Sequence, residues 1–386
     1  MNSDSIYLDE DLDAIRRQTQ EFIAREIVPH ADQWEVDGRV PREVIRQMGE
    51  LGFLGLRHPE TYGGLAKGAL YSAVFAEALG GSTYGGFEVT ILVHTDMASP
   101  HLIHSGNSEQ LDRYMGKIVS GEILTAIAVS EPAAGSDVAG MRSSARRDGP
   151  SDSDDWLING SKIFITNGVT ADLLIVAART EPGNPRGISM FLVEKDAPGL
   201  VISRKLEKTG WLSSDTAELS FQDCRVPARN LLGTENRGFY EIMKNFQNER
   251  LVLSGMSIGA SQKALDLTYD WTQNRTAFGG VLFDKQVIRQ RLAMQQAKVD
   301  AGRQLLYHSA WLMEQGIDAT REVSELKAFA GELVNQVTYD CVQFHGGAGY
   351  MRETAVERMS RDARVMSIGG GATEVMLEEV AKRSKV

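Results

Sequence analysis

The chain has 386 residues, of which 42% are hydrophobic and 24% charged, an ordinary composition for a globular protein. This length exceeds what one compact core usually holds and predicts two or three domains. The net charge of −11 argues against a nucleic-acid-binding protein, which would need a basic face for phosphates. No apolar run approaches the roughly 18 residues that span a bilayer, and the acidic start lacks the pattern of a signal peptide. We therefore expect a cytoplasmic protein without a membrane segment.

Three regions differ in periodicity. Apolar residues recur at helical spacing in the first region, which predicts an α-helical domain over residues 1–121. The second region predicts an antiparallel β domain over residues 122–232, because short β-rich runs alternate with turn residues such as Gly160. Helical periodicity returns in the third region and predicts a four-helix bundle over residues 233–386. The predicted fold class is α+β, and the expected strands are Leu124–Ser130, Trp156–Ile158, Lys162–Thr166, Leu173–Ala178, Ile188–Val193 and Leu219–Val226.

The third region begins with a helical stretch in which one acidic residue interrupts an apolar seam. Glu249 occupies the position that completes the seam, whose apolar members are Ile242, Phe246, Leu253 and Met256. Burial raises the pKa of a carboxyl group, so Glu249 is a candidate general base. The alternative is a structural carboxylate that reaches solvent or an arginine of another helix.

Several familiar motifs lack the context that their chemistry needs. The G-x-S-x-G spelling at Gly255–Gly259 lies inside a helical pattern, whereas a hydrolase nucleophile requires a turn between a strand and a helix. His101 and His104 have no third ligand nearby, and the two cysteines are far apart, so we expect no metal site. Nucleotide-binding motifs of the Rossmann and P-loop types do not occur.

Three stretches have the composition of ligand-binding loops. Val129–Asp137 (VSEPAAGSD) follows a β run and offers backbone N–H groups and a hydroxyl to an anion. Lys162–Gly168 (KIFITNG) places an aromatic ring and a hydroxyl on a strand. Val365–Glu374 (VMSIGGGATE) has three glycines before a helix, which permit a close approach of the backbone to a ligand. Each stretch alone could be only a turn, and their joint occurrence carries the argument.

These stretches belong to a larger set of motifs with a family resemblance. Together with the α–β–α order, the chain resembles the acyl-CoA dehydrogenase family from about Leu8 to Lys382, through SEPAAGSD, INGSKIFITNG, Asn274-Arg275 before Phe278-Gly279, QFHGGAGY at 343–350 and RDAR at 361–364. The resemblance implies FAD as cofactor and a homotetramer. It further implies that the flavin lies between the β domain and the C-terminal helices, with a contribution from a neighbouring subunit.

The resemblance also implies which residues bind FAD. Residues against the flavin ring would be Ile127, Val129, Ser130, Gly135, Ser136, Phe164, Ile165 and Thr166, with Phe164 where the family more often has Trp. Residues near the pyrophosphate and adenosine would be Arg275, Phe278, Gln286, Gln343, Gly346 and Gly347. Ala372 and Glu374 complete the set at the last helix. Ala277 and Ala372 stand where many members carry Thr, so one or two hydrogen bonds to the cofactor would be missing or made by water.

The main departure from the family pattern concerns the catalytic acid. Many members carry a Glu in the turn before the last helix, where this chain has Gly370. A branch that includes the isovaleryl-CoA and long-chain enzymes instead carries its Glu on the earlier helix, just before an Arg, and here Glu249 and Arg250 match that pattern. The resemblance therefore implies Glu249 as base and the Gly370 N–H as a donor to the thioester oxygen, with substrate contacts from Ser136, Phe246, Arg250 and Gly369.

The implied reaction is α,β-dehydrogenation of an acyl thioester of medium, long or branched chain, with an electron-transfer flavoprotein as electron acceptor. A thioester on an acyl carrier protein is an alternative to acyl-CoA. A flavin oxidase on the same scaffold and a helical scaffold protein without catalysis are the alternatives from other classes.

Overall fold

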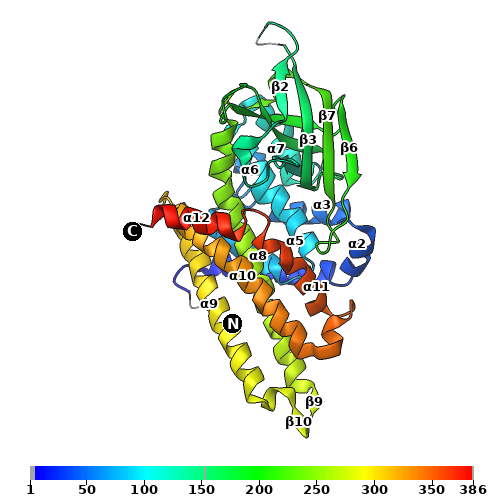
Figure 1. Ribbon diagram of the computed structural model, residues 1–386, viewed down its shortest axis with the longest axis vertical. Coiled ribbons are helices and arrows are strands. Elements are labelled where there is room, and N and C mark those ends of the chain that lie inside the picture. The colour runs from blue at the N-terminus through cyan, green and yellow to red at the C-terminus, as the bar shows by residue number, and fades with distance from the viewer. Residues whose placement is uncertain (1–4, 152–153, 385–386) are drawn as a thin grey trace.

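The computed structural model describes residues 5–151 and 154–384 and has a helical, a β and a second helical region in chain order (Figure 1). The predicted α+β class is confirmed. The first region is helical because its apolar positions repeat at helical spacing, and its helices end at glycines such as Gly38 or begin at caps such as Asp9. These helices are α1 (Glu10–Phe22), α2 (Ala31–Asp37), α3 (Arg42–Glu50), α4 (Ala69–Gly80), α5 (Gly85–Leu92), α6 (Ser99–Ser105) and α7 (Ser108–Val119).

A π-helical turn, Val93–Ala98, joins α5 to α6 and is buried throughout. A π turn widens the helix and removes the ordinary backbone partners of some carbonyl groups. Those carbonyls therefore accept hydrogen bonds from side chains of the later helix Gly238–Asn274.

The middle region is a twisted sheet with strand order β6-β7-β3-β2-β4-β5-β8 and β1 beside β4. Most neighbouring strands are antiparallel, as expected, but β1 runs parallel to β4 with Ile127 opposite Ile175, and β2 meets β4 in parallel at Ser144. The predicted break at Gly160 is wrong, because Gly160 lies at a bulge inside one continuous strand. The strands are β1 (Thr125–Ala128), β2 (Ser144–Arg147), β3 (Trp156–Thr166), β4 (Leu173–Arg179), β5 (Ile188–Glu194), β6 (Leu200–Lys205), β7 (Thr216–Val226) and β8 (Leu231–Leu232).

The last region is organised around α8, which spans Gly238–Asn274 and runs from the sheet to a small hairpin at the opposite end of the molecule (Figure 1). Its middle is buried between α4 and α10, and Gly255 and Gly259 let α4 approach closely. Ser257, inside this helix, donates to the Leu253 carbonyl, so the G-x-S-x-G spelling lies within a helix as expected. The other elements are β9 (Thr276–Ala277), β10 (Gly280–Val281), α9 (Gln286–Glu314), α10 (Thr320–His345), α11 (Ala355–Ala363) and α12 (Thr373–Arg383).

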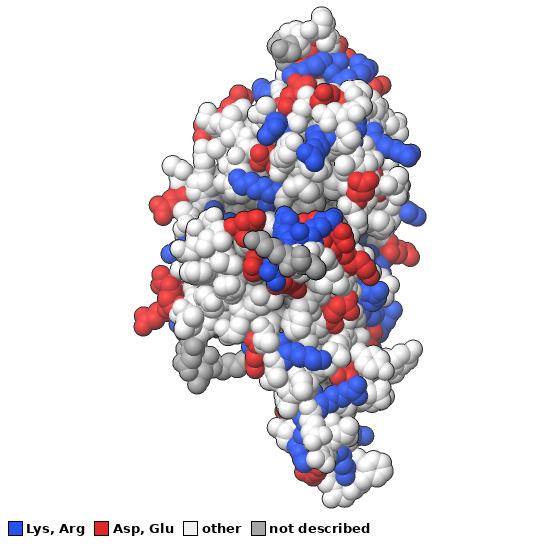
Figure 2. Space-filling view, turned by 60° about the vertical axis from the view of Figure 1, so that its left-hand side comes forward, with Lys and Arg blue, Asp and Glu red and all other residues white. Residues whose placement is uncertain are grey.

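The surface mixes both signs of charge. On the face seen in Figure 2, Lys and Arg alternate with Asp and Glu and form no continuous basic stripe. Among residues 5–151 and 154–384, no helix combines the length and apolarity needed to cross a membrane.

Candidate functional site

Glu249 lies on the buried face of α8, where the apolar seam predicted it. Its side chain is 8% exposed, and Asn245 Nδ2 donates to its Oε1 at 3.1 Å. Burial raises the pKa of Glu249 to about 8, and the Asn245 hydrogen bond and the Arg250 charge offset only part of that rise. A carboxyl group with a pKa near neutrality can accept and release a proton under working conditions. Glu249 therefore has the properties of a general base.

The π-helical turn holds the part of α8 that carries Glu249. Asn245 Nδ2 donates to the carbonyl of Met97 at 3.0 Å, and Asn248 Nδ2 donates to the carbonyl of Asp96 at 2.9 Å. These are carbonyls of the π turn, whose altered hydrogen bonding leaves them available as acceptors. Sequence reasoning missed Asn245 and Asn248. Their only signal is that two amides lie next to an apolar seam.

The glycine turn before α12 lies against the same part of α8. Gly370 and Gly371 both have left-handed backbone conformations, with φ of 65° and 105°. A Cβ atom on Gly370 would overlap Cδ1 of Leu253, and one on Gly371 would lie 3.5 Å from Nε of Arg250. Among the described residues, no group accepts a hydrogen bond from the Gly370 N–H. The turn thus presents a free donor beside the helix that carries Glu249.

Arg250 follows Glu249 on α8, and its Nε lies close to Gly371 of the glycine turn. Its guanidinium is near the Phe246 ring, with 5.6 Å between the guanidinium carbon and the ring centroid. Its Nε is buried and has no partner within residues 5–151 and 154–384. Burial lowers the pKa of Arg250, although Glu249 and Glu379 raise it. An unpartnered buried donor at this place is available to a ligand.

The loop after β1 is anchored by a buried ion pair that sequence reasoning missed. Lys162 Nζ donates to Glu131 Oε1 at 2.8 Å and to the Val129 carbonyl at 3.1 Å. Glu131 also accepts from the backbone N–H groups of Arg142 and Ser143. Burial lowers the pKa of Lys162 to about 8, and the adjacent ammonium group holds the pKa of Glu131 below its usual value despite desolvation. The pair fixes both ends of the loop.

This anchoring brings the first group of predicted flavin contacts together. The Ile163 N–H donates to the Ser130 carbonyl at 3.0 Å, so the loop after β1 lies beside β3. Phe164 follows at a bulge in β3, with φ of 61° and 68% exposure, and therefore points away from the core. Thr166 ends the strand opposite Thr216. The neighbouring members of this group are Ile127, Val129 and Ile165, whereas Gly135 and Ser136 are exposed on the loop.

The second group of predicted cofactor contacts lies at the other end of the molecule. Arg275 and Phe278 belong to the β9–β10 hairpin, and Phe278 is 92% exposed with φ of 53° (Figure 1). At 1.5 Å per residue, the straight course of α8 places Arg275 about 40 Å from Glu249. Trp271 and His345 stack with ring centroids 5.0 Å apart and join this end of α8 to the end of α10. The second group also contains Gln286, Gln343, Gly346 and Gly347.

The remaining predicted residues lie around α12. Ala372 precedes the helix and Gly369 lies in the turn, both half-buried, whereas Glu374 is exposed in the first helical turn. The carboxylate of Glu374 therefore lacks the burial that distinguishes Glu249. Only Glu249 of these two acids is buried, which is the condition that raises the pKa of a carboxyl group.

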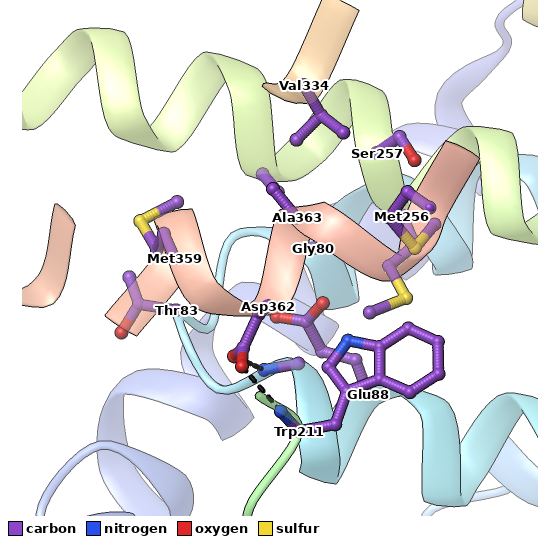
Figure 3. A pocket seen from close by; sticks show the side chains of 13 residues that line it. Gly80, Thr83, Glu88, Trp211, Met256, Ser257, Val334, Met359, Asp362 and Ala363 are labelled. Carbon is purple, nitrogen blue, oxygen red and sulfur yellow. Dashed lines mark hydrogen bonds between the residues drawn. The ribbon is translucent and has the colours of Figure 1, made fainter. Parts of the chain in front are cut away.

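Two cavities lie elsewhere and do not include Glu249. A small one of about 20 Å³ lies where the three regions meet, and Figure 3 shows Glu88, Trp211 and Asp362 around it. Asp362 accepts from the backbone N–H groups of Gly85 at 3.0 Å and Trp211 at 2.6 Å, so it holds these regions together. A groove of about 1090 Å³ lies between α1 and the long helices and is lined by residues such as Arg16. Among the described residues, no group of three or more His, Cys, Asp or Glu side chains could hold a metal ion.

Comparison with known proteins gives a family for this arrangement. The chain matches the acyl-CoA dehydrogenase N-terminal domain over residues 9–122, the middle domain over 126–224 and the C-terminal domain over 236–385. It is 39% identical over 376 residues to the mitochondrial long-chain specific acyl-CoA dehydrogenase of Sus scrofa, covering 96% of this chain and 85% of that protein.

Solved structures agree with the sequence match. An acyl-CoA dehydrogenase from Geobacillus kaustophilus is 39% identical, with a TM-score of 0.94 over 99% of this chain and 100% of that chain. A glutaryl-CoA dehydrogenase from Mycobacterium smegmatis, solved in complex with FADH2, is 26% identical, with a TM-score of 0.92 over 98% of this chain and 96% of that one. The matches to all three domains and to these relatives agree: the chain belongs to the acyl-CoA dehydrogenase family.

Proposed function

We propose that the protein is an FAD-dependent acyl-CoA dehydrogenase in which Glu249 is the catalytic base. The observation that carries the assignment is the buried Glu249 on α8, with its pKa raised to about 8, beside a glycine turn that has no acid of its own. The family and its FADH2-bound member support the cofactor and the reaction class.

The residues on the β side fit a flavin ring. Phe164 exposes an aromatic face, while the loop from Ser130 to Ser136 offers hydroxyls and backbone N–H groups beside it. When bound, the flavin supplies an acceptor for the hydride that leaves the β carbon of the substrate. Glu249 removes the α proton as that hydride leaves, so one acyl thioester becomes a trans-2-enoyl thioester.

The thioester oxygen gains negative charge as the α proton is removed and needs a donor in place. The N–H of Gly370 is the proposed donor, because it is free and its turn lies against α8. A preorganised donor of this kind lowers a barrier by about 3 kcal/mol. Arg250, Phe246, Gly369 and Ser136 are proposed to line the path of the substrate.

The second group of cofactor contacts supports a site shared between two chains. The separation of about 40 Å between Arg275 and Glu249 exceeds the length of an extended FAD, so one chain cannot place both groups on one cofactor. Arg275 of a second chain would pair with the pyrophosphate, a role that suits a guanidinium. We therefore propose a homo-oligomer, with the homotetramer as the expected form and an electron-transfer flavoprotein as the electron acceptor.

The proposed substrate is a medium, long or branched acyl-CoA. The mitochondrial long-chain relative is 39% identical, which supports a long acyl chain, and Gly369 contributes no side chain to the proposed acyl path. An acyl thioester on a carrier protein would need the same chemistry at the α and β carbons. The two differ only in the group beyond the thioester.

The test is an anaerobic absorbance titration of the flavin-bound protein with isovaleryl-, octanoyl-, palmitoyl- and citronellyl-CoA. We expect at least one of them to bleach the flavin band, and the most effective one identifies the chain class. A flavin that none of them bleaches contradicts the acyl-CoA proposal and directs the search to carrier-protein thioesters. Peroxide production in air with a nitroalkane or amine would indicate an oxidase instead.

A matched pair of variants tests the base. Glu249→Gln keeps the size of the side chain and should slow flavin reduction by more than about a hundredfold while retaining FAD. Glu374→Gln changes an exposed acid that the resemblance assigns to FAD binding, so its reduction rate is compared per bound flavin and should be close to that of the wild type. If the two variants exchange these outcomes, Glu374 is the base.

A further inference from the structure

The glycine turn carries no side chain that could hold it in place, yet it must keep the Gly370 N–H at one position. Side chains of α10 fix the position of the turn. Lys327 Nζ donates to the carbonyl of Met366 at 2.7 Å and to the carbonyl of Gly371 at 2.9 Å, one on each side of Gly370. The side chain of Lys327 is 1% exposed, so water does not compete for these two bonds.

Two more residues on the same face of α10 bind the same segment. Asn335 Nδ2 donates to the carbonyl of Ala363 at 3.0 Å. Gly331, one turn from each of Lys327 and Asn335, has no side chain, and a Cβ there would lie 2.7 Å from the Met366 carbonyl oxygen. Lys327, Gly331 and Asn335 thus form one strip at spacings of four residues, against which the chain from 363 to 371 lies.

The chemistry of Lys327 suits this task. A buried ammonium group is costly unless its donors are satisfied, and here it has two backbone carbonyl partners and no carboxylate partner among the described residues. Its pKa is lowered to about 8, chiefly by burial and also by the Arg250 charge, whereas Glu332 acts in the opposite direction. A neutral residue would fill the same space at less cost, so the charge at this site is unexplained by packing alone.

We propose that Lys327 is a positioning residue for the dehydrogenation, acting by holding the glycine turn so that the Gly370 N–H meets the thioester oxygen. The inference rests on the proposed function for the identity of the reaction. The role of Lys327 in holding the turn can be tested without any substrate. Lys327 does not touch the reacting atoms, and its effect passes through the turn.

The first experiment measures hydrogen exchange of the FAD-bound protein. The amides of Ile368 and Gly369 both donate to the Val365 carbonyl and report on the segment that Lys327 holds. In Lys327→Met we expect their exchange to accelerate by about tenfold or more, because two anchoring bonds are lost. The control is Lys208→Met, which removes a half-buried lysine that also donates to a backbone carbonyl, that of Ser214, in the β6–β7 loop. It should leave these amides unchanged.

The second experiment measures flavin reduction by the acyl-CoA that bleaches the wild-type flavin. Lys327→Met should lower kcat by about tenfold or more with KM within about threefold, because the donor matters most in the transition state. The absorbance band formed with a 3-thia-acyl-CoA, whose α proton is unusually acidic, should weaken for the same reason. Lys208→Met should leave kcat, KM and the intensity of this absorbance band unchanged per bound flavin.

Each outcome decides the proposal. Unchanged exchange in Lys327→Met, or faster exchange with wild-type reduction, overturns it. If Lys327→Met does not fold, Gly331→Ala shifts the turn while keeping the lysine, and it must show the same loss of kcat. If the wild type itself is reduced by no acyl-CoA, the proposed function fails, while the exchange measurement still decides whether Lys327 holds the turn.

Discussion

Gly370 lies against Leu253, the residue one helical turn beyond Glu249 on α8. The proposed base and the proposed oxyanion donor thus come from segments more than a hundred residues apart that meet at one leucine side chain. The contact leaves no space for a side chain at position 370. It also ties the position of the donor to the helix that carries the acid.

Gly370→Ala should therefore both destabilise the protein and slow the reduction of its flavin. The left-handed conformation costs a non-glycine residue about 1–2 kcal/mol, and the added Cβ displaces Leu253. We expect a lower Tm and slower flavin reduction, with part of the loss restored by Leu253→Val, which lacks a Cδ atom. Gly369→Ala is the stability control, because its Cβ would meet only Val365 at 3.7 Å. Equal losses of Tm in both alanine variants would count against the steric argument.

The raised pKa of Glu249 predicts a pH dependence. A base must be ionised before it can accept a proton, so kcat/KM for flavin reduction should rise with pH through about 8. Asn245 donates to the carboxylate and favours its ionised form, so Asn245→Leu should move this rise to higher pH. Asn230→Leu removes another buried amide, which donates to the Leu192 carbonyl in the β domain, and should leave the midpoint in place. A midpoint that falls in Asn245→Leu contradicts the assignment.

The buried pair of Lys162 and Glu131 should contribute strongly to stability and to flavin content. Lys162→Met leaves Glu131 buried beside only backbone donors, and losing one partner of such a pair costs about 3–5 kcal/mol. Urea unfolding should show that loss, and the ratio of FAD to protein should fall because the loop after β1 moves. The double variant with Glu131→Gln should recover part of the stability. Lys195→Met breaks an exposed pair with Asp172 and should cost about 1 kcal/mol or less.

A site shared between chains predicts complementation between two inactive variants. Glu249→Gln lacks the base, and Arg275→Ala lacks the proposed partner of the pyrophosphate. In a mixed dimer of the two, one site carries both defects and the other carries none. We expect such dimers, purified through two different tags, to regain about half of the wild-type activity per chain. A mixed dimer as inactive as its parents would mean that each site is built from one chain.

Local patterns predicted much of this molecule. The seam on α8 located Glu249 because three of its four apolar members, Ile242, Leu253 and Met256, are buried on the same face. Ser257 was predicted as a packing residue because its motif lies within helical periodicity. In both cases the decisive interactions are within one helix, and sequence spacing records them directly.

Interactions between distant segments could not be predicted in the same way. Nothing in the spacing of Glu131 and Lys162 indicates that they form an ion pair. The carbonyl that accepts the hydrogen bond of Asn245 is available only because the chain forms a π-helical turn at Val93–Ala98. The strands β2, β6 and β8 were missed for a related reason: β6 is largely exposed, and the other two are short, so none of them has a clear alternating pattern. The parallel pairing of β1 with β4 likewise depends on how the chain crosses the sheet.

The contact between Leu253 and Gly370 also constrains how such an enzyme could evolve. A glutamate at position 370 would meet an occupied space and an unfavourable backbone angle, so it would be a burden before it could serve as a base. Leu253 would have to shrink or rotate first, and only then could the acid on α8 be lost without loss of activity. The order of these substitutions matters. A protein with both acids would carry the steric and backbone cost at position 370, and a protein with neither acid would lack the proposed base. A chain with its acid on α8 therefore meets a steric barrier to moving that acid to the turn.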